Sequence, residues 1–202
     1  MSRARMLLRT LGEDLRTVIE RDPSVRTHVE ALLHPALPAV WTHRIAHRLH
    51  RRGHRVPARA LMVLVRSVTG TEIHPGAELG RRVFIDHGAA VVIGETARVG
   101  DDVTIYHQVT LGAIGWWHDN GRPEGERRHP VVGDGVVLGA GATVLGPVTV
   151  EAGAVVGART FVVKDVPAKA RVLARATTSG PPRQTPQCAI ELLRHTASAG
   201  SW

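Results

Sequence analysis

The sequence predicts a mainly β protein with N-terminal helices, in which a left-handed parallel β-helix of hexapeptide repeats follows a small α-helical domain. Aliphatic residues recur every six positions from residue 73 onward, and glycine follows many of them. The residues before this repeat have the three- and four-residue apolar spacing of helices. A six-residue frame held this long is typical of short strands and turns, three of which complete one triangular coil.

The segment 1–70 is the expected helical domain. Val40, Trp41, Ile45 and Leu49 follow helical spacing with arginines between them, as in an amphipathic helix. Glycine at position 53 is expected to end this helix, and proline at position 57 fits the first turn of the next one.

The β-helix is expected over residues 71–168. One aliphatic side chain from each hexad should stack inside the prism, and the glycines relieve crowding at its corners. Hexapeptide-repeat proteins wind left-handed, an exception to the usual right-handed crossover of parallel strands. The expected inward residues are Ile73, Leu79, Ile85, Ile93, Val99, Ile105, Leu111, Val132, Leu138, Val144, Val150, Val156 and Val162.

Two interruptions of the six-residue frame mark candidate functional positions. The first is a two-residue insertion within 85–92, which contains His87. The second is a polar stretch at about 113–131, which contains His129 and should leave the prism as a loop. Long loops on a rigid scaffold commonly hold binding residues. The repeat fades after residue 168, so 169–202 is expected to form a C-terminal tail.

Charge and composition exclude several classes of protein. The net charge is +8, but arginine and lysine are spread along the chain and aromatic residues make up 3%. No nucleic-acid partner is therefore predicted, whereas a polyanionic small substrate suits this charge. The single cysteine, Cys188, allows no intramolecular disulfide. The most apolar window, 60–65, is too short to span a membrane, so a cytoplasmic protein without a membrane partner is predicted.

Several short segments, taken together, match the motifs of one known family. They read EIHPGA at 72–77, IDHG at 85–88, VIGET at 92–96, VTLG at 109–112, RHP at 128–130 and LGAGA at 138–142. Upstream, RDPSV at 21–25 and WTHRIAH at 41–47 belong to the same set. Together they closely resemble serine O-acetyltransferases, a family of hexapeptide-repeat acyltransferases, over about residues 20–167.

The resemblance implies transfer of an acetyl group from acetyl-CoA to the L-serine hydroxyl, in a ternary complex, for cysteine biosynthesis. A hydroxyl is a poor nucleophile until a base removes its proton, and histidine titrates close to working pH. By resemblance, His87 is that base and Glu72 is the acidic partner that orients its ring, where many relatives have aspartate. His129 completes the implied catalytic set.

The resemblance also implies how the substrates are held. Asp22 and Asp86 would receive the serine ammonium, while Arg128 and His129 would hold its carboxylate and the reacting region. Four positions match the family's CoA contacts, no metal is implied, and a homotrimer is expected because relatives build each site between neighbouring prisms. The implied CoA contacts are Gly112, Ala140, Ala158 and Lys164.

Some residues have a second interpretation. Asp22 precedes a proline and would equally well cap the start of a helix. The histidines at 43, 47, 50 and 54 have helical spacing, but no glutamate completes a zinc motif, so they are interpreted as a solvated helix face. Trp116 and Trp117 would either shape the substrate loop or anchor it.

Three departures from the family pattern leave other functions open. Gly112 is followed by alanine and a long loop where relatives have a second glycine and a short one, which leaves room for another small hydroxyl or amine acceptor. The last coil reads RVLAR at 171–175, which weakens the CoA assignment there. Members that dock into cysteine synthase end in isoleucine, whereas this sequence ends in Trp202 and leaves that partnership open.

Two other classes share the repeat. A γ-type carbonic anhydrase needs three zinc-binding histidines, with a closely spaced pair on one coil, and no such pair occurs between positions 74 and 107. A non-catalytic β-helix used for assembly is the second class.

Overall fold

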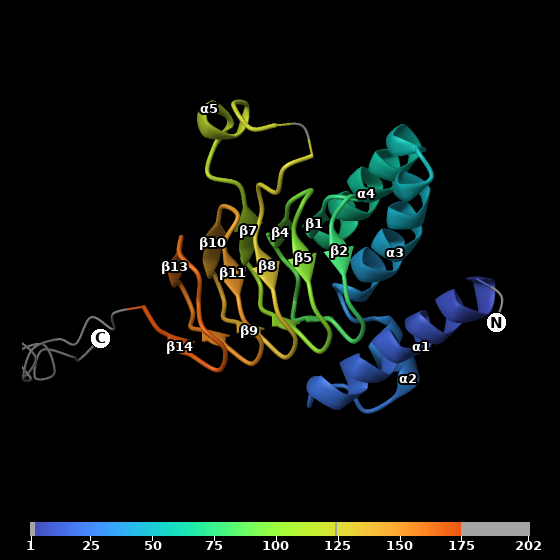
Figure 1. Cartoon of the computed structure of the whole chain (residues 1–202). Coiled ribbons are helices and arrows are strands. Elements are labelled where there is room, and N and C mark those ends of the chain that lie inside the picture. Colours follow the sequence, from blue (N-terminus) through green and yellow to red (C-terminus); the bar gives the residue numbers. More distant parts are fainter. Residues whose placement is uncertain (1–2, 124, 175–202) are drawn as a thin grey trace, which may run out of the picture.

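The computed structural model describes residues 3–123 and 125–174. Four helices pack against one end of a three-sided prism of parallel strands, and a long loop that contains a fifth, short helix projects from the prism (Figure 1). The helices are α1 (Arg3–Arg21), α2 (His28–Leu32), α3 (Leu37–Arg51), α4 (Arg55–Thr69) and α5 (Trp116–Asp119).

Each face of the prism is one parallel sheet, because each coil contributes one strand to each face. The last coil differs, since it meets the second face only through a bridge between Val150 and Val166. The first face contains β1 (Glu72–Ile73), β4 (Val92–Ile93), β7 (Thr110–Gly112), β10 (Thr143–Leu145) and β13 (Phe161–Val162). The second contains β2 (Glu78–Leu79), β5 (Arg98–Val99), β8 (Val131–Val132) and β11 (Thr149–Val150). The third contains β3 (Phe84–Ile85), β6 (Thr104–Ile105), β9 (Val137–Leu138), β12 (Val155–Val156) and β14 (Arg171–Val172).

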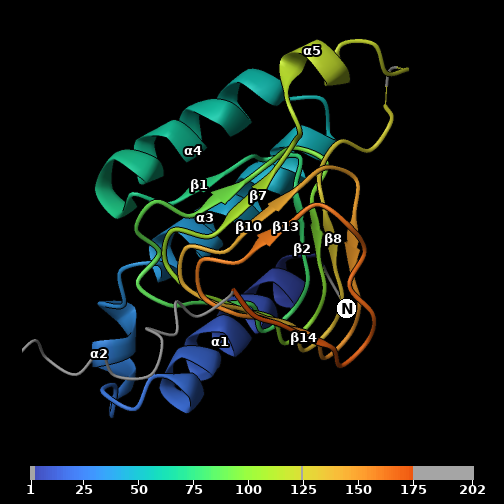
Figure 2. The ribbon, with the colours of Figure 1, turned by 90° about the vertical axis from the view of Figure 1, so that its left-hand side faces the viewer.

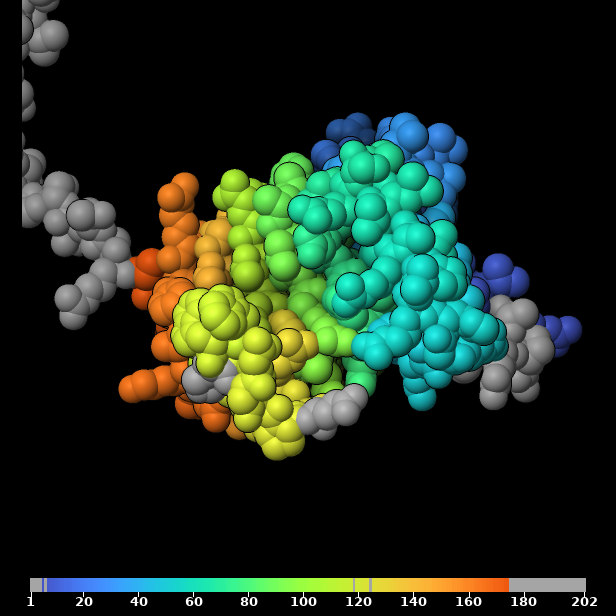
Figure 3. Space-filling view, turned by 90° about the horizontal axis from the view of Figure 1, so that it is seen from above, coloured from blue at the N-terminus to red at the C-terminus, as the bar shows by residue number. Residues whose placement is uncertain are grey.

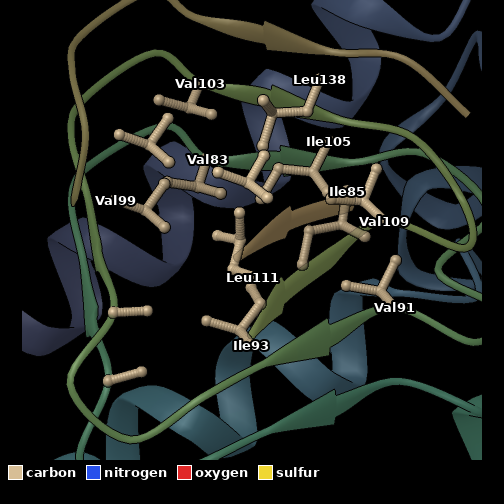
Figure 4. Packing of buried hydrophobic residues seen from close by; sticks show 14 of the residues in the cluster. Val83, Ile85, Val91, Ile93, Val99, Val103, Ile105, Val109, Leu111 and Leu138 are labelled. Carbon is tan, nitrogen blue, oxygen red and sulfur yellow. The ribbon is translucent and has the colours of Figure 1, made fainter. Parts of the chain in front are cut away.

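The interior of the prism is the main hydrophobic core, and it confirms the predicted left-handed β-helix. Aliphatic side chains from successive coils stack on one another inside it (Figure 4). All of the predicted inward residues are buried except Leu79, which is half-buried. The strands extend past residue 168, because Val155 and Val156 of β12 pair with Arg171 and Val172 of β14.

The helices dock onto the first coil rather than standing free. Helix α1 lies beside β3 and α4 lies beside β1 (Figure 2). The guanidinium of Arg44 in α3 forms two 2.7 Å hydrogen bonds to the buried carboxylate of Asp14 in α1 and also donates to the carbonyls of Leu79 and Gly80. This buried ion pair joins α1, α3 and the first coil.

The prediction of a solvated histidine face on α3 is wrong for two of its members. His43 is 2% exposed, and its Nε2 lies 3.1 Å from the carbonyl oxygen of Ala77. His47 Nδ1 lies 2.9 Å from the carbonyl oxygen of Pro75. Both rings therefore contact backbone carbonyls at a corner of the first coil. Helical spacing alone does not reveal these contacts, because the carbonyls are distant in sequence.

Candidate active site

His87 lies in the turn between β3 and β4, at the corner where the third and first faces meet. The strand registers pair Ile85 with Ile105, Ile105 with Leu138, and Leu138 with Val156. The residues that lie two positions after these strand residues are therefore also stacked on successive coils. They form one column along the prism, which consists of His87, His107, Ala140 and Ala158. We call this column and the turns around it the His87 corner.

The His87 ring is exposed and free of hydrogen bonds. Its side chain is 70% exposed, and its Nε2 lies 3.9 Å from the Asp86 carboxylate, too far for a hydrogen bond. Among the described residues no other group bonds to it. The ring of His107 packs edge-on against it, with 5.8 Å between centroids and 70° between planes. The backbone at His87 has φ of 61°, in the left-handed region, as it also has in other turns of the coils, for example at Gln108 and Arg159.

The N-terminal helices bring acidic and imidazole groups to this corner. Arg21, at the end of α1, donates to the carbonyl of Asp102 and to the hydroxyl of Thr104, which fixes the next residue, Asp22. Hydrogen bonds from Ser24 to Oδ1 of Asp22 lower the pKa of that carboxyl, with smaller contributions from nearby imidazoles, His87 among them. Asp22 therefore stays charged beside the candidate base.

The alternative interpretation of Asp22 as a helix cap is not borne out. Helix α2 begins at His28 and is capped by Thr27, whose hydroxyl accepts from the Glu30 amide in a capping box. Asp22 instead closes a turn at the end of α1 by accepting from the amide and hydroxyl of Ser24. That turn uses only one carboxylate oxygen of Asp22.

His34 is a buried member of the same corner that sequence reasoning missed. It is 5% exposed, its ring packs against Phe84, and its Nδ1 has no hydrogen-bond partner in the structure. Burial lowers the pKa of His34, while the nearby carboxylates of Asp22 and Asp86 act in the opposite direction. A neutral imidazole behind these two carboxylates leaves their negative charge available for a cation.

The structure does not join Glu72 to His87. The Glu72 carboxylate lies 3.0 Å from the guanidinium of Arg66 in α4, and within the described part of the chain it makes no hydrogen bond or ion pair with His87. Glu72 sits on β1, in register with Val92 just after the His87 turn. The catalytic dyad implied by the resemblance is thus not formed in this structure.

Arg128 and His129 occupy a different corner, where the first and second faces meet; we call it the His129 corner. The His129 ring is 8% exposed, and its Nδ1 accepts from the amide of Thr96 and lies 2.9 Å from the Thr96 hydroxyl. Because an amide can only donate, Nδ1 is unprotonated and Nε2 has the hydrogen. Burial, followed by the charge of Arg128, lowers the pKa of His129 and keeps its ring neutral.

A close approach to Gly94 fixes the position of that ring. A Cβ at Gly94 would lie 2.0 Å from His129 Nε2 and Cδ2. The Thr96 hydroxyl also accepts from the amides of Arg128 and His129, so it organises the chain as it returns to the prism. Thr96 is a second residue that the motif search did not single out, although it ends the VIGET segment.

A charged cavity of about 570 Å³ adjoins the His129 corner. Helices α3 and α4 contribute His50 and Arg55, the coils contribute Glu95 and Arg98, and the long loop contributes Arg128. The Arg128 guanidinium lies 2.6 Å from the Glu95 carboxylate. Figure 3 looks onto this side of the molecule, with the long loop in yellow and α3 and α4 in teal.

The four implied CoA positions divide between the two corners. Ala140 and Ala158 lie in the same column as His87. Gly112 ends β7 and Lys164 follows β13, both on the side of the first face nearest the His129 corner, and Lys164 is exposed. The described residues thus place two of the four in the same column as the candidate base.

The long loop between β7 and β8 projects from the prism and is held by its own contacts. The Asp119 carboxylate accepts from the Gly115 amide and from Arg122, and Arg127 donates to the carbonyl of Pro147. Trp116 and Trp117 lie on α5, are 72% and 70% exposed, and contact each other edge-on. Neither ring is buried as an anchor within the chain. From residue 175 the tail, with Cys188 and Trp202, lies outside the described residues.

Two kinds of feature are absent from residues 3–123 and 125–174. None of the helices there combines the length and apolar character needed to cross a membrane. His, Cys, Asp and Glu side chains in these ranges form no group of three that could hold a metal ion.

Comparison with known proteins yields one consistent group of relatives. No protein-family model matches the chain. A serine acetyltransferase of Mycobacterium tuberculosis is 51% identical over 168 residues, which cover 83% of this chain and 70% of that protein. One of Staphylococcus xylosus is 46% identical over 167 residues, covering 82% and 74%.

Solved structures give the same result. Native serine acetyltransferase 1 of Entamoeba histolytica has a TM-score of 0.76 and 40% identity, covering 83% of this chain and 62% of that one. The Neisseria gonorrhoeae enzyme in complex with serine has a TM-score of 0.75 and 36% identity, covering 83% and 66%. The Brucella abortus enzyme in complex with coenzyme A has a TM-score of 0.76 and 36% identity, covering 84% and 65%. This chain therefore spans 62–66% of the length of these structures.

Proposed function

This chain belongs to the serine acetyltransferase family, and we propose that it transfers the acetyl group of acetyl-CoA to the hydroxyl of L-serine. The reaction supplies O-acetylserine for cysteine biosynthesis in the cytoplasm. One observation carries the proposal: the exposed His87 ring stands beside charged Asp22 and Asp86 and in register with Ala140 and Ala158. A base, an acidic pair and a column with two small residues therefore share one corner.

In the proposed mechanism His87 acts as general base. It accepts the serine hydroxyl proton as the oxygen attacks the thioester carbonyl, so that the attacking oxygen does not become positively charged. The products of this step are the imidazolium of His87 and a tetrahedral intermediate with a negative charge on the former carbonyl oxygen. The tetrahedral intermediate then collapses, the carbon–sulfur bond breaks, and the imidazolium returns the proton to the CoA sulfur. No acyl-enzyme forms, and Glu72 would stabilise the imidazolium only after leaving Arg66.

The charged groups suit a zwitterionic amino acid. Asp22 and Asp86 offer an acidic pole for the ammonium, and Arg128 with the Nε2–H of His129 offers a basic pole for the carboxylate. His129 Nδ1 is already occupied by Thr96, which favours a donor role for this ring over a second base. Ala140 and Ala158 leave room for the pantetheine arm, while Gly112 and Lys164 would contact CoA from the other corner.

The two poles lie on different corners of one chain, so we propose that they meet between neighbouring copies in a homotrimer. A flat-sided prism can bury a face by threefold packing, and each contact would then join the His87 corner of one copy to the His129 corner of the next. This arrangement explains why each half-site is ordered but incomplete within the single chain.

A thiol-release assay across a panel of amino acids tests the activity. We expect CoA release with L-serine far above the rate with water, and loss of that release in His87→Ala.

Other outcomes would change the assignment. If L-serine releases CoA no faster than water does, and another hydroxyl or amine compound releases it faster, that compound is the acceptor in place of serine. The insertion bearing Trp116 and Trp117 favours this second candidate. Retained activity in His87→Ala would contradict the assigned base, and stoichiometric zinc would favour a carbonic anhydrase.

Mixed oligomers test the proposed trimer. His87→Ala and Arg128→Ala chains with different tags are co-expressed, and complexes with both tags are purified. Each mixed trimer would contain one intact site, so we expect about one third of wild-type activity from two inactive parents. Mixed complexes as inactive as the parents, or a monomer mass by light scattering, would contradict a shared site.

A further inference from the structure

The column at the His87 corner has one large side chain between the candidate base and the small residues. His107 lies one coil from His87, and Ala140 and Ala158 lie on the next two coils. The stretch of small residues in this column therefore ends at the His107 ring. A pantetheine arm that runs along this column toward His87 meets His107 immediately before the base.

The turn that holds His107 is fixed by the coils on both sides. The carbonyl of His107 accepts from the Gly141 amide at 2.9 Å, and the Gln108 amide donates to the Ala89 carbonyl at 2.8 Å. His107 Nδ1 is buried and has no hydrogen-bond partner among residues 3–123 and 125–174. Within this part of the chain, the ring is thus held by packing and by the position of its backbone.

The base itself is weakly held. His87 lacks a hydrogen bond in the described part of the chain, and its side chain is largely exposed. A side chain in that condition samples several rotamers, and only some of them direct a ring nitrogen toward a bound hydroxyl. The edge-on contact with His107 is the ring contact that restricts the imidazole of His87.

We propose that His107 is a positioning residue, which restricts the orientation of the His87 imidazole at the end of the column that contains Ala140 and Ala158. This inference rests on the proposed function and adds a residue to it. Other charged or titratable groups near His87 are Asp22, His34 and Asp86. None of them makes a ring-to-ring contact with it, so the orientation of the base depends on His107.

Three variants at this position test the proposal in the full chain. His107→Ala removes the ring, and we expect kcat to fall about 10- to 100-fold while both KM values and the melting temperature stay close to wild type. His107→Phe keeps a planar ring without nitrogen and should recover most of kcat, whereas His107→Gln should not. Gln108→Asn, in the same turn, is the matched control and should leave kcat unchanged.

Other outcomes would overturn the inference. Wild-type kcat in His107→Ala would do so, as would recovery by Gln and not by Phe, which would indicate hydrogen bonding. If His107→Ala fails to fold, the comparison of Phe with Gln still decides. Failure of the proposed function is separately visible, because wild type would then release no CoA with L-serine. The contact can then still be tested by NMR, because the ring current of His107 displaces the resonance of the His87 ring. That resonance should move in His107→Phe and stay in place in Gln108→Asn. An unmoved resonance in His107→Phe would contradict the contact between the two rings.

Discussion

The two corners hold their histidines in opposite ways. The His87 ring is 70% exposed and has no hydrogen bond within the described residues, whereas the His129 ring is 8% exposed and receives two contacts from Thr96 at Nδ1. A general base needs a free nitrogen that can gain and lose a proton, and a binding group needs one fixed donor. The difference is consistent with the proposed roles, in which His87 would transfer a proton and His129 would bind a charged group of the substrate.

Replacing each histidine by asparagine gives the sharpest test of this division. His87→Asn should lower kcat about 10²- to 10⁴-fold, the usual contribution of a general base. His129→Asn removes a hydrogen bond to a charged group, worth about 1.5–3 kcal/mol, and should act mainly on the KM for serine. Steady-state kinetics with both substrates measures the two effects, and the reverse pattern would contradict the comparison.

The His87 corner also depends on the helical domain, whereas the His129 corner depends on the long loop. Arg44→Met leaves the Asp14 carboxylate, whose side chain is 1% exposed, without its partner. We expect a loss of about 3–5 kcal/mol in the free energy of unfolding, measured with urea. Arg9→Ala breaks an exposed pair with Glu13 and should change it by about 0.5 kcal/mol or less. Equal effects of the two variants would show that the buried pair does not hold α1 in place.

The position of the His129 ring can be changed by a substitution at a neighbouring residue, without replacing His129 itself. Gly94→Ala places a methyl group 2.0 Å from the ring, so the ring must move away from Thr96. We expect a loss of about 1–3 kcal/mol in stability and an increase in the KM for serine. Gly12→Ala is the control, because a methyl group there meets nothing within 4 Å and favours the helix by about 0.5–1 kcal/mol. An unchanged KM in Gly94→Ala would contradict the binding role.

Acid should loosen the helices from the first coil. Burial lowers the pKa of His43 to about 3 and that of His74 to about 4, against about 6.5 in the unfolded chain. The unfolded state therefore binds more protons below about pH 6.5, and stability falls as the pH drops from there toward 3. Above that range these two groups add no pH dependence. Each contributes a slope of up to about 1.4 kcal/mol per pH unit.

Urea unfolding at several pH values measures this slope. His43→Gln keeps a donor for the Ala77 carbonyl and removes one titrating group, so the slope should become shallower. His28→Gln replaces an exposed residue and should leave the slope unchanged. An unaltered slope in His43→Gln would show that this ring does not couple the helices to acid.

Much of the fold follows from local repetition. The six-residue frame identifies Ile85, Ile105 and Leu138 as inward residues because each strand obeys the same packing rule as the strand one coil earlier. The frame also predicts where the chain must leave the prism, since a polar stretch with glycine and tryptophan cannot fill the core. Applied one step further, it places His107 beside His87, because the two residues follow strands in register.

Contacts between distant segments decided the rest. Helical spacing on α3 gave no sign that His43 and His47 bond to corner carbonyls of the first coil. The motifs named Glu72 and His87 as a dyad, but Glu72 pairs with Arg66 in this structure. The motifs also gave no sign that, within one chain, His87 and His129 lie on different corners of the prism.

The sequence by itself determined the prism, its loop and the residue types of an acetyl-transfer site, because a stacked repeat encodes its geometry within each hexad. Only the tertiary structure decided which of those residues share a corner and which rings are free or fixed. The physical reason is that such contacts depend on how the helices and the long loop fold back onto coils far away in the chain, where no local pattern records the partner.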